Sequence, residues 1–144
     1  MNITIRDVDL NDAFWITGLS GQLGYESEND KIVNRLRDIT ANKDQGIFVV
    51  EYNNKVIGWI HAFYALRVES DPFVEIGGMV VDEQYRRHGI GTALTEKVIG
   101  WAKKRKVRKI RVRCNTTRSE THWFYERLGY TETKEQKIFD NKLM

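Results

Sequence analysis

A short basic loop with two glycines is the segment whose residue types most clearly point to chemistry. It follows the apolar residues 79–81 and carries the spacing Arg86-x-x-Gly89-x-Gly91 ahead of an apolar helical pattern. Glycine lets backbone N–H groups approach an anion without a Cβ clash, and a helix N-terminus adds favourable potential. The loop therefore predicts a phosphate-binding site, although a basic turn that only caps a helix has the same pattern. The third glycine of a dinucleotide fingerprint and the Gly-Lys-Ser/Thr end of a P-loop are both missing.

A second block lies near the end of the chain. Asn115 follows an expected strand, and residues 124–130 have the sequence Phe-Tyr-Glu-Arg-Leu-Gly-Tyr. This stretch is typical of an amphipathic helix, with Thr117 and Glu120 at the spacing of a capping box and Gly129 at the left-handed position after the helix. The two blocks, in this order, resemble the GNAT family of N-acetyltransferases. The resemblance covers essentially the whole chain, although the first 45 residues match in pattern only.

The resemblance implies acetyl-CoA as cosubstrate and names the residues that hold it. The pyrophosphate would lie on the backbone N–H groups of the basic loop, with added charge from its side chains. The pantetheine arm would pair with the strand at residues 79–81, where a neighbouring strand splays away, and Asn115 would bond it from the other side. Asn115 is equally typical of a turn that ends a strand. The predicted cosubstrate-binding residues are Met79, Val80, Val81, Arg86, Arg87, His88, Gly89, Ile90, Gly91, Thr92 and Asn115.

Two residues are candidates for the proton transfers. A primary amine with a pKa of about 10 is roughly one part in a thousand free base at neutral pH, so a general base speeds its attack. Glu75 lies four residues before the pantetheine-binding strand segment and resembles the family's general base, acting directly or through a water. The alternative is a solvent-facing glutamate on a half-buried strand. Tyr125 matches the family tyrosine that protonates the coenzyme A thiolate, and the alternative is a packed aromatic side chain.

The family resemblance also implies that the first two helices and their loop cover the acceptor. Acidic and tyrosine side chains in that loop suit a cationic amine, although a solvated, helix-capping loop has the same composition. The predicted substrate-binding residues are Tyr25, Glu26, Glu28 and Trp59, the last of which alternates with His61 and Phe63 on a strand face that lines either the core or the pocket.

These inferences predict an N-acetyltransferase that moves acetyl directly to a primary amine of a small molecule in a ternary complex. A protein or peptide N-terminal or lysine acetyltransferase is the enzyme alternative, and it needs an open groove. A non-catalytic acyl-CoA sensor on the same fold is the other alternative, and it needs neither Glu75 nor Tyr125.

Hydrophobic periodicity gives the elements that must position these residues. Strands are expected at residues 3–8, 46–52, 55–68, 73–81 and 109–114, and helices at about 9–19, 27–39, 90–104 and 118–128. Two short strands, at 130–133 and 136–143, would finish the order β-α-α-β-β-β-α-β-α-β-β.

Asn53-Asn54 predicts a tight hairpin, and Gly77-Gly78 predicts a bulge. The helix at 90–104 should bury Ile90, Leu94, Val98 and Trp101. The expected class is α+β: the GNAT acyl-CoA N-acyltransferase fold, with a mixed, mostly antiparallel, splayed sheet flanked by helices.

Composition is that of an ordinary globular protein. With 144 residues, 41% hydrophobic and 30% charged, the chain should form a single N-acetyltransferase domain, residues 1–144. The sequence has no apolar run of about 18 residues and no signal-peptide pattern, so we expect no membrane span. The single cysteine, Cys114, fits a reducing cytoplasm, and the three histidines show no metal-ligand spacing, so no metal is expected.

Positive charge is concentrated in one stretch. The net charge is +3, and residues 103–113 carry eight positive charges and no acid. Such a stretch can bind nucleic acid, but here it spans a helix C-terminus, where cations are favourable, and then a half-buried strand. We therefore expect no nucleic-acid partner. A homodimer is common in the family, and no feature of the sequence decides it.

Overall fold

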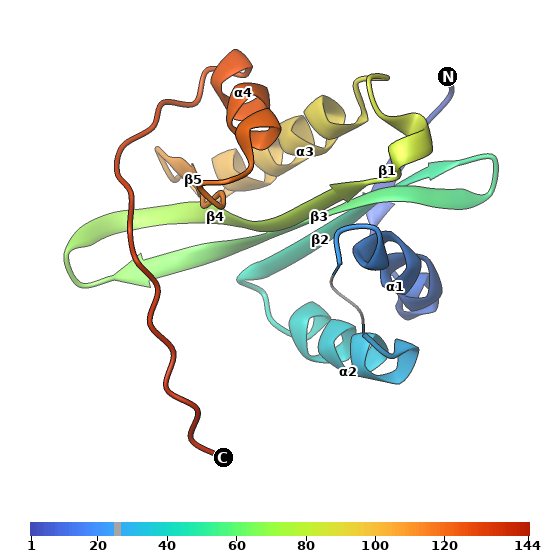
Figure 1. Ribbon diagram of the computed structural model, residues 1–144, viewed down its shortest axis with the longest axis horizontal. Coiled ribbons are helices and arrows are strands. Elements are labelled where there is room, and N and C mark those ends of the chain that lie inside the picture. The colour runs from blue at the N-terminus through green and yellow to red at the C-terminus, as the bar shows by residue number, and fades with distance from the viewer. Residues whose placement is uncertain (25–26) are drawn as a thin grey trace. The chain divides into compact units, whose positions relative to one another are not determined.

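The computed structural model describes residues 1–24 and 27–144, which form two compact units, Met1–Val112 and Arg113–Met144. The first unit contains the sheet with the helices α1, α2 and α3, and the second contains α4 and the C-terminal segment (Figure 1).

A five-stranded sheet, in which the strand order follows the chain, is the base of the first unit. The strands are β1 (Thr4–Asp7), β2 (Gln45–Tyr52), β3 (Lys55–Arg67), β4 (Ser70–Val81) and β5 (Ile110–Val112). Neighbours from β1 to β4 pair antiparallel, whereas β4 and β5 are parallel. The mixed, mostly antiparallel sheet and the α+β class are thus confirmed.

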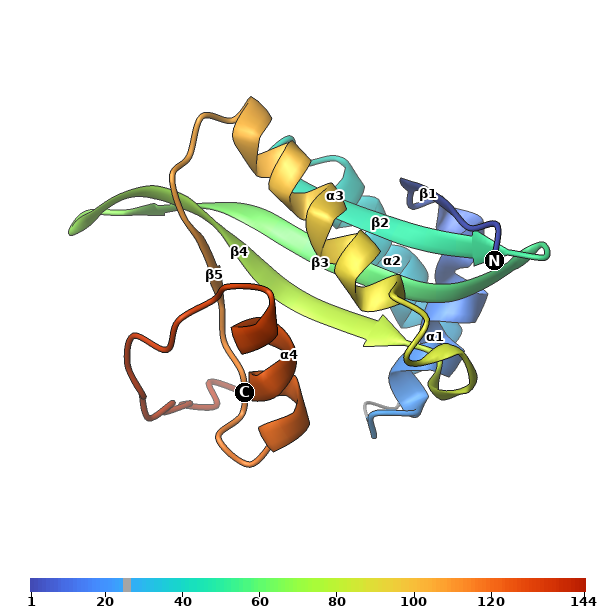
Figure 2. The same ribbon diagram turned by 90° about the horizontal axis from the view of Figure 1, so that it is seen from above.

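Helices cover both faces of this sheet. α1 (Ala13–Gly21) and α2 (Asn29–Thr40) lie on one face, and α3 (Ile90–Lys104) lies on the other (Figures 1 and 2). On the first face, Ile16 of α1 and Leu36 of α2 pack in one apolar cluster with Ile47 of β2 and Trp59 of β3. Among the described residues, no helix is long and apolar enough to cross a membrane.

The apolar stripe of α3 differs from the expected one at a single position. Ile90, Leu94 and Val98 are buried as periodicity predicts. The expectation for Trp101 is wrong, because the next buried residue is Ala102 and Trp101 is only half-buried. The indole instead covers Gly46 of β2, where a Cβ would lie 3.0 Å from its Cε2 atom.

Two predicted backbone features position the site. Asn53 and Asn54, with φ of 50° and 61°, turn the chain between β2 and β3. His61 of β3 pairs with Gly78 of β4, and the register then skips Gly77. The bulge predicted from the glycine pair is therefore confirmed, and Gly77 is its extra residue.

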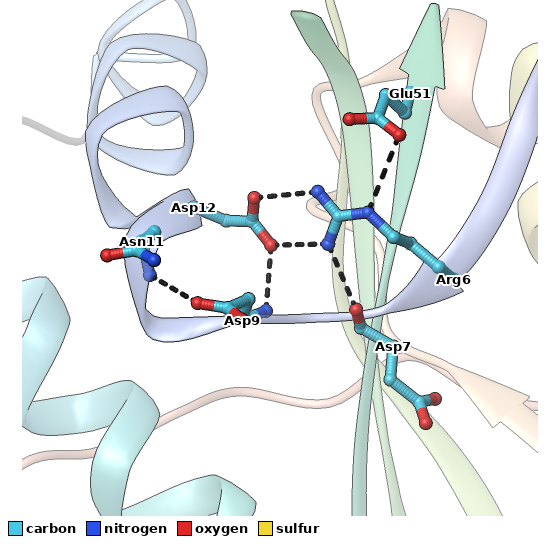
Figure 3. Close-up of polar contacts among 6 residues, drawn as sticks. All are labelled: Arg6, Asp7, Asp9, Asn11, Asp12 and Glu51. Carbon is cyan, nitrogen blue, oxygen red and sulfur yellow. Dashed lines mark hydrogen bonds and ion pairs between the residues drawn. The ribbon is translucent and has the colours of Figure 1, made fainter. Parts of the chain in front are cut away.

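A buried carboxylate ties β1 to the helix layer (Figure 3). Asp12 is 5% exposed and accepts hydrogen bonds from Arg6 Nη1 and Nη2 at 2.8 and 2.9 Å, and from the Asp9 N–H at 2.7 Å. Asp9 caps the short 3-10 turn η1 (Leu10–Asp12) by accepting from the N–H of Asn11. The start of α1 is thus fixed against β1.

We expect Asp12→Asn to destabilise the fold. Burial alone raises the pKa of Asp12, but the hydrogen bonds and charge of Arg6 and the Asp9 N–H outweigh it and hold the pKa below its usual value. Such a carboxylate stabilises fully above its unfolded pKa, and the contribution is lost as pH falls through the folded pKa. The loss should be about 2 kcal/mol at pH 7 and should shrink below about pH 4. Chemical denaturation at pH 7 and pH 3 checks this, with the exposed Asp38→Asn as control; an equal loss at both pH values contradicts it.

The second unit has a shorter helix than expected. α4 (Ser119–Arg127) is followed by Gly129 with φ of 95°, as predicted. The capping box is wrong: Arg118 is the N-cap residue and makes no side-chain cap bond. The Thr117 hydroxyl instead donates to Asn115 Oδ1 at 3.2 Å, so it serves the preceding turn.

The two expected C-terminal strands are also wrong, because the described residues after α4 form no strand. Residues 131–137 are polar and exposed, so they have no apolar face to bury. Ile138 and Phe139 are 83% and 88% exposed. Strands are stabilised by cross-strand side-chain pairs, and short-range alternation alone does not supply them.

Candidate active site

The β4 edge that faces β5 is paired over only part of its length. β5 pairs with Val74, Glu75 and Ile76, and the described chain offers no strand partner on this edge to residues 77–81. On its other edge, residues 78–81 pair with β3. The pairing of β4 with β5 therefore ends just before the bulge glycine, Gly77. The free backbone groups of residues 79–81, the predicted pantetheine-binding segment, suit an extended polar ligand.

β4 leads through the turn η2 (Glu83–Tyr85) into the basic loop (Figure 2). Arg87 has φ of 66°, and Gly89, the N-cap residue of α3, has φ of 76°. Left-handed residues within such a turn direct successive N–H groups to one side, where they form an anion-binding concavity. The side chains of Arg86, Arg87 and His88 are exposed, whereas Ile90 is 2% exposed and anchors the helix start.

The first turn of α3 completes this concavity. The Ala93 N–H donates to the Gly89 carbonyl at 3.0 Å, which closes the first helical turn. The N–H groups before it, including those of Gly91 and Thr92, have no intrahelical acceptor, as at any helix N-terminus. The structure thus places the predicted loop residues together at the start of α3, and their binding of an anion stays a prediction.

Glu75 lies beside the point where the strands part. It is 7% exposed, and in the sheet it lies between Phe63 of β3 and Arg111 of β5. Paired residues point to the same face of a sheet, and alternate residues of a strand share a face. Glu75 therefore shares the face of Trp59, which packs on the α1 and α2 layer. The burial excludes the alternative of a solvent-facing glutamate.

Trp59 covers the bulge from this face. A Cβ on Gly78 would lie 3.1 Å from its Cη2 atom. The indole Nε1 is buried and has no hydrogen-bond partner among the described residues. A buried donor of this kind can be satisfied by a bound group or by water.

His61 is the next residue on the same face. Its Nε2 lies 2.6 Å from Oε1 of Gln45, which belongs to β2 and is sixteen residues earlier in the sequence. Burial lowers the pKa of the imidazole. The sequence predicts the face on which His61 lies, but nothing local in it points to Gln45.

Tyr125, in the second unit, is 5% exposed. Its ring centroid lies 5.0 Å from that of Phe124 and 5.3 Å from that of Tyr130. Burial, followed by the influence of Cys114 and Tyr130, raises the pKa of the phenol well above its usual range. The hydroxyl therefore keeps its proton at neutral pH, which is the form a proton donor needs.

Asn115 serves the turn before α4. Its Oδ1 accepts from the N–H and the hydroxyl of Thr117 at 3.4 and 3.2 Å, and its carbonyl oxygen lies 2.8 Å from His122 Nε2. The turn role that the sequence allowed is confirmed. A bond from Asn115 to pantetheine stays a prediction.

Two predicted acceptor residues, Tyr25 and Glu26, lie outside the described residues. Glu28 is exposed and is the N-cap residue of α2, without a side-chain cap bond. A cavity of about 550 Å³ opens between α1, the start of β3 and Asp82, and its lining includes neither Glu28 nor Trp59.

In the described part of the chain, no three His, Cys, Asp or Glu side chains are grouped to hold a metal ion.

Comparison with known proteins decides the family. The family model described as the Acetyltransferase (GNAT) family matches residues 10–130. This chain belongs to the GNAT family. An uncharacterized N-acetyltransferase of Methanocaldococcus jannaschii is 35% identical to this GNAT chain over 91 residues. The match covers 62% of this chain but only 40% of that relative's length.

Solved structures show the same fold. The aminoglycoside antibiotic 6'-N-acetyltransferase AAC(6')-Ih of Acinetobacter baumannii superimposes with a TM-score of 0.87 at 19% identity, over 99% of this chain and 100% of that one. AAC(6')-Iy, solved with the bisubstrate analog CoA-S-monomethyl-acetylneamine, gives 0.87 at 18% identity, over 99% of both chains. At these identities the likeness establishes the GNAT fold and leaves the substrate open.

Proposed function

We propose that this GNAT chain transfers the acetyl group of acetyl-CoA to a primary amine of a small molecule, by direct attack in a ternary complex. The observation that carries the proposal is the sequence of features along one strand. β4 carries the buried Glu75, is no longer paired with β5 from Gly77 onward, and leads into the loop with left-handed residues before α3. Along the chain, a buried carboxylate is thus followed by an unpaired strand edge and then by a loop that suits an anion.

Acetyl-CoA suits these features in the same order. The pyrophosphate fits the N–H groups of residues 87–92, next to the exposed Arg86 and Arg87 side chains. The pantetheine amides fit the free β4 edge at residues 79–81. The CoA-derived analog held by AAC(6')-Iy supports this choice of cosubstrate.

The reaction breaks the thioester C–S bond and forms an amide. Glu75 accepts the amine proton, directly or through a water, and Tyr125 gives a proton to the departing thiolate. N–H groups on the free edge of β4 polarise the thioester carbonyl as an oxyanion site does. The acidic residues Glu26 and Glu28 of the sequence suit a cationic acceptor, and the structural neighbour AAC(6')-Ih is an aminoglycoside antibiotic 6'-N-acetyltransferase.

The experiment that tests the proposal is a thiol-release assay with acetyl-CoA, a panel of small amines and a set of peptides. The protein's own thiol, Cys114, can also react with the thiol reagent, slowly because burial raises its pKa. A control without amine measures this background so that it can be subtracted. Turnover of small amines supports the proposal. Turnover of peptides alone identifies a protein acetyltransferase, and acetyl-CoA binding without any turnover identifies a sensor.

The glycine at the loop gives the first binding prediction. We expect Gly89→Val to weaken acetyl-CoA binding at least tenfold, about 1.4 kcal/mol. Gly89 has φ of 76°, which a β-branched residue adopts only with strain, and that strain would change the backbone whose N–H groups we propose bind the pyrophosphate. Calorimetry measures the affinity, and Gly100→Val, on open α3 surface, is the matched control. Unchanged affinity in folded Gly89→Val contradicts the loop's role.

We further propose that the chain forms a homodimer. The support is the C-terminal segment, whose apolar side chains Ile138, Phe139 and Leu143 are exposed by more than four fifths, at 83%, 88% and 87%. A second copy would remove this surface from water. Light scattering of the purified chain tests the proposal, and a monomer mass at micromolar concentration contradicts it.

A further inference from the structure

His61 is a polar side chain on the Glu75 face of the sheet to which the chemistry above gives no role. It is half-buried on β3, between Trp59 and Phe63. Its two ring nitrogens have different surroundings, and that difference determines what the ring can bind.

Gln45 fixes one nitrogen. An amide oxygen only accepts hydrogen bonds, so across the 2.6 Å contact His61 Nε2 carries the proton and donates it to Gln45 Oε1. Burial lowers the pKa of His61 below 6.5, so the ring is neutral at pH 7. A neutral imidazole with its proton on Nε2 has a lone pair on Nδ1.

That lone pair lies at the bulge. A Cβ built on Gly77 would lie 3.1 Å from Nδ1 and 3.3 Å from Cε1 of Phe63. Gly77 is exposed and has only hydrogen at this position. It is also the first residue of β4 beyond the pairing with β5, two positions after Glu75. The acceptor atom of His61 therefore lies beside the residue of β4 at which the pairing with β5 has ended.

We infer that His61 is a specificity-determining residue of the acceptor site, whose Nδ1 accepts a hydrogen bond from the ammonium group of the incoming amine. Gln45 is then a positioning residue that fixes the tautomer. The inference rests on the proposed function and narrows it to acceptors that enter as cations with an N–H donor. Most primary amines are in this form at neutral pH.

Protonation of His61 should reverse its effect. An imidazolium has no acceptor and repels a cationic amine. The groups around the ring are Gln45 and Ile47 from β2, Gly78 and Glu75 from β4, and the apolar cluster of α1 and α2. Of these named groups, only Glu75 has an ionisable side chain. The KM for the amine should therefore rise as pH falls below the pKa of His61, while the KM for acetyl-CoA stays constant.

The experiment measures KM and kcat for the best amine between pH 5.5 and 8 in wild type, His61→Phe and His61→Asn. Phenylalanine keeps a ring but has no acceptor, whereas asparagine offers an amide oxygen near the Nδ1 position that does not titrate. We expect His61→Phe to raise the amine KM about tenfold at pH 7.5, as for the loss of one charge-assisted hydrogen bond, with the acetyl-CoA KM unchanged. We expect His61→Asn to recover most of the affinity and to remove the rise in KM at low pH.

An unchanged amine KM and pH profile in His61→Phe would overturn the inference and leave the transferase activity standing. Wild type without turnover of any amine would instead remove the proposed function, and the inference with it. Should His61→Phe fail to fold, Gly77→Ala provides the second variant, because its methyl group would lie 3.1 Å from Nδ1 and block the lone pair. Gly77→Ala with wild-type amine KM would likewise overturn the inference.

Discussion

Replacing Glu75 with glutamine is expected to lower kcat/KM for the best amine about a hundredfold. Glutamine keeps the size of the side chain and its hydrogen-bonding oxygen but cannot take a proton at neutral pH. The acidic limb of the pH profile should change with it, because that limb reports the base of the free enzyme. Acetyl-CoA affinity should hardly change, because the side chain faces the α1 and α2 layer.

The position of Glu75 is the physical reason for so large an effect. It is 7% exposed and lies one residue before the end of the β4 and β5 pairing. A carboxylate held there has its orientation set by two neighbouring strands. A positioned base contributes about 10²–10⁴-fold to a proton transfer, and the lower end of that range applies when a water can substitute.

The control must separate chemistry from folding. Glu69→Gln, at an exposed position on the turn between β3 and β4, removes one charge without touching the site and should leave kcat/KM unchanged. Thermal unfolding of both variants shows whether the fold is intact. Glu75→Gln activity within about threefold of wild type across pH 6–9 would assign the base role to another group or to water.

Local signals in the sequence predicted the features that need special backbone geometry. The asparagine pair at 53–54 and Gly89 all have positive φ, and the glycine pair at 77–78 forms the bulge. Each of these conformations has a strong residue preference, so a few neighbouring residues suffice to predict it. The strand that carries Glu75 and the loop that follows it were therefore predictable together.

Features that depend on distant partners were not predictable in this way. Gln45 and His61 meet only because β2 and β3 pair in one register, and Glu75 lies beside Arg111 only because β4 pairs with β5. The same limit explains the C-terminal error. Residues 130–143 have short-range alternation, but a strand also needs a partner edge, which no local pattern contains.

Replacing Tyr125 with phenylalanine is expected to lower kcat about ten- to a hundredfold, with little change in melting temperature. The substitution keeps the ring and its contacts with Phe124 and Tyr130 and removes only the hydroxyl. Burial, aided by Cys114 and Tyr130, raises the pKa of this phenol, so the hydroxyl stays protonated throughout pH 6–9. The drop in kcat should therefore be the same at every pH in that range, unlike the effect of Glu75→Gln.

Tyr130→Phe is the matched control for this prediction. Tyr130 belongs to the same aromatic group, with its ring centroid 5.3 Å from that of Tyr125, and burial raises its pKa as well. Loss of its hydroxyl should leave kcat unchanged if Tyr125 alone donates to the thiolate. Equal kcat in wild type and Tyr125→Phe would make the tyrosine a packing residue and give the proton transfer to solvent or to the substrate ammonium.

A structure with coenzyme A bound tests the same point independently. The Tyr125 hydroxyl must lie within hydrogen-bond reach of the sulfur, and a separation above about 5 Å without a bridging water would count against the donor role.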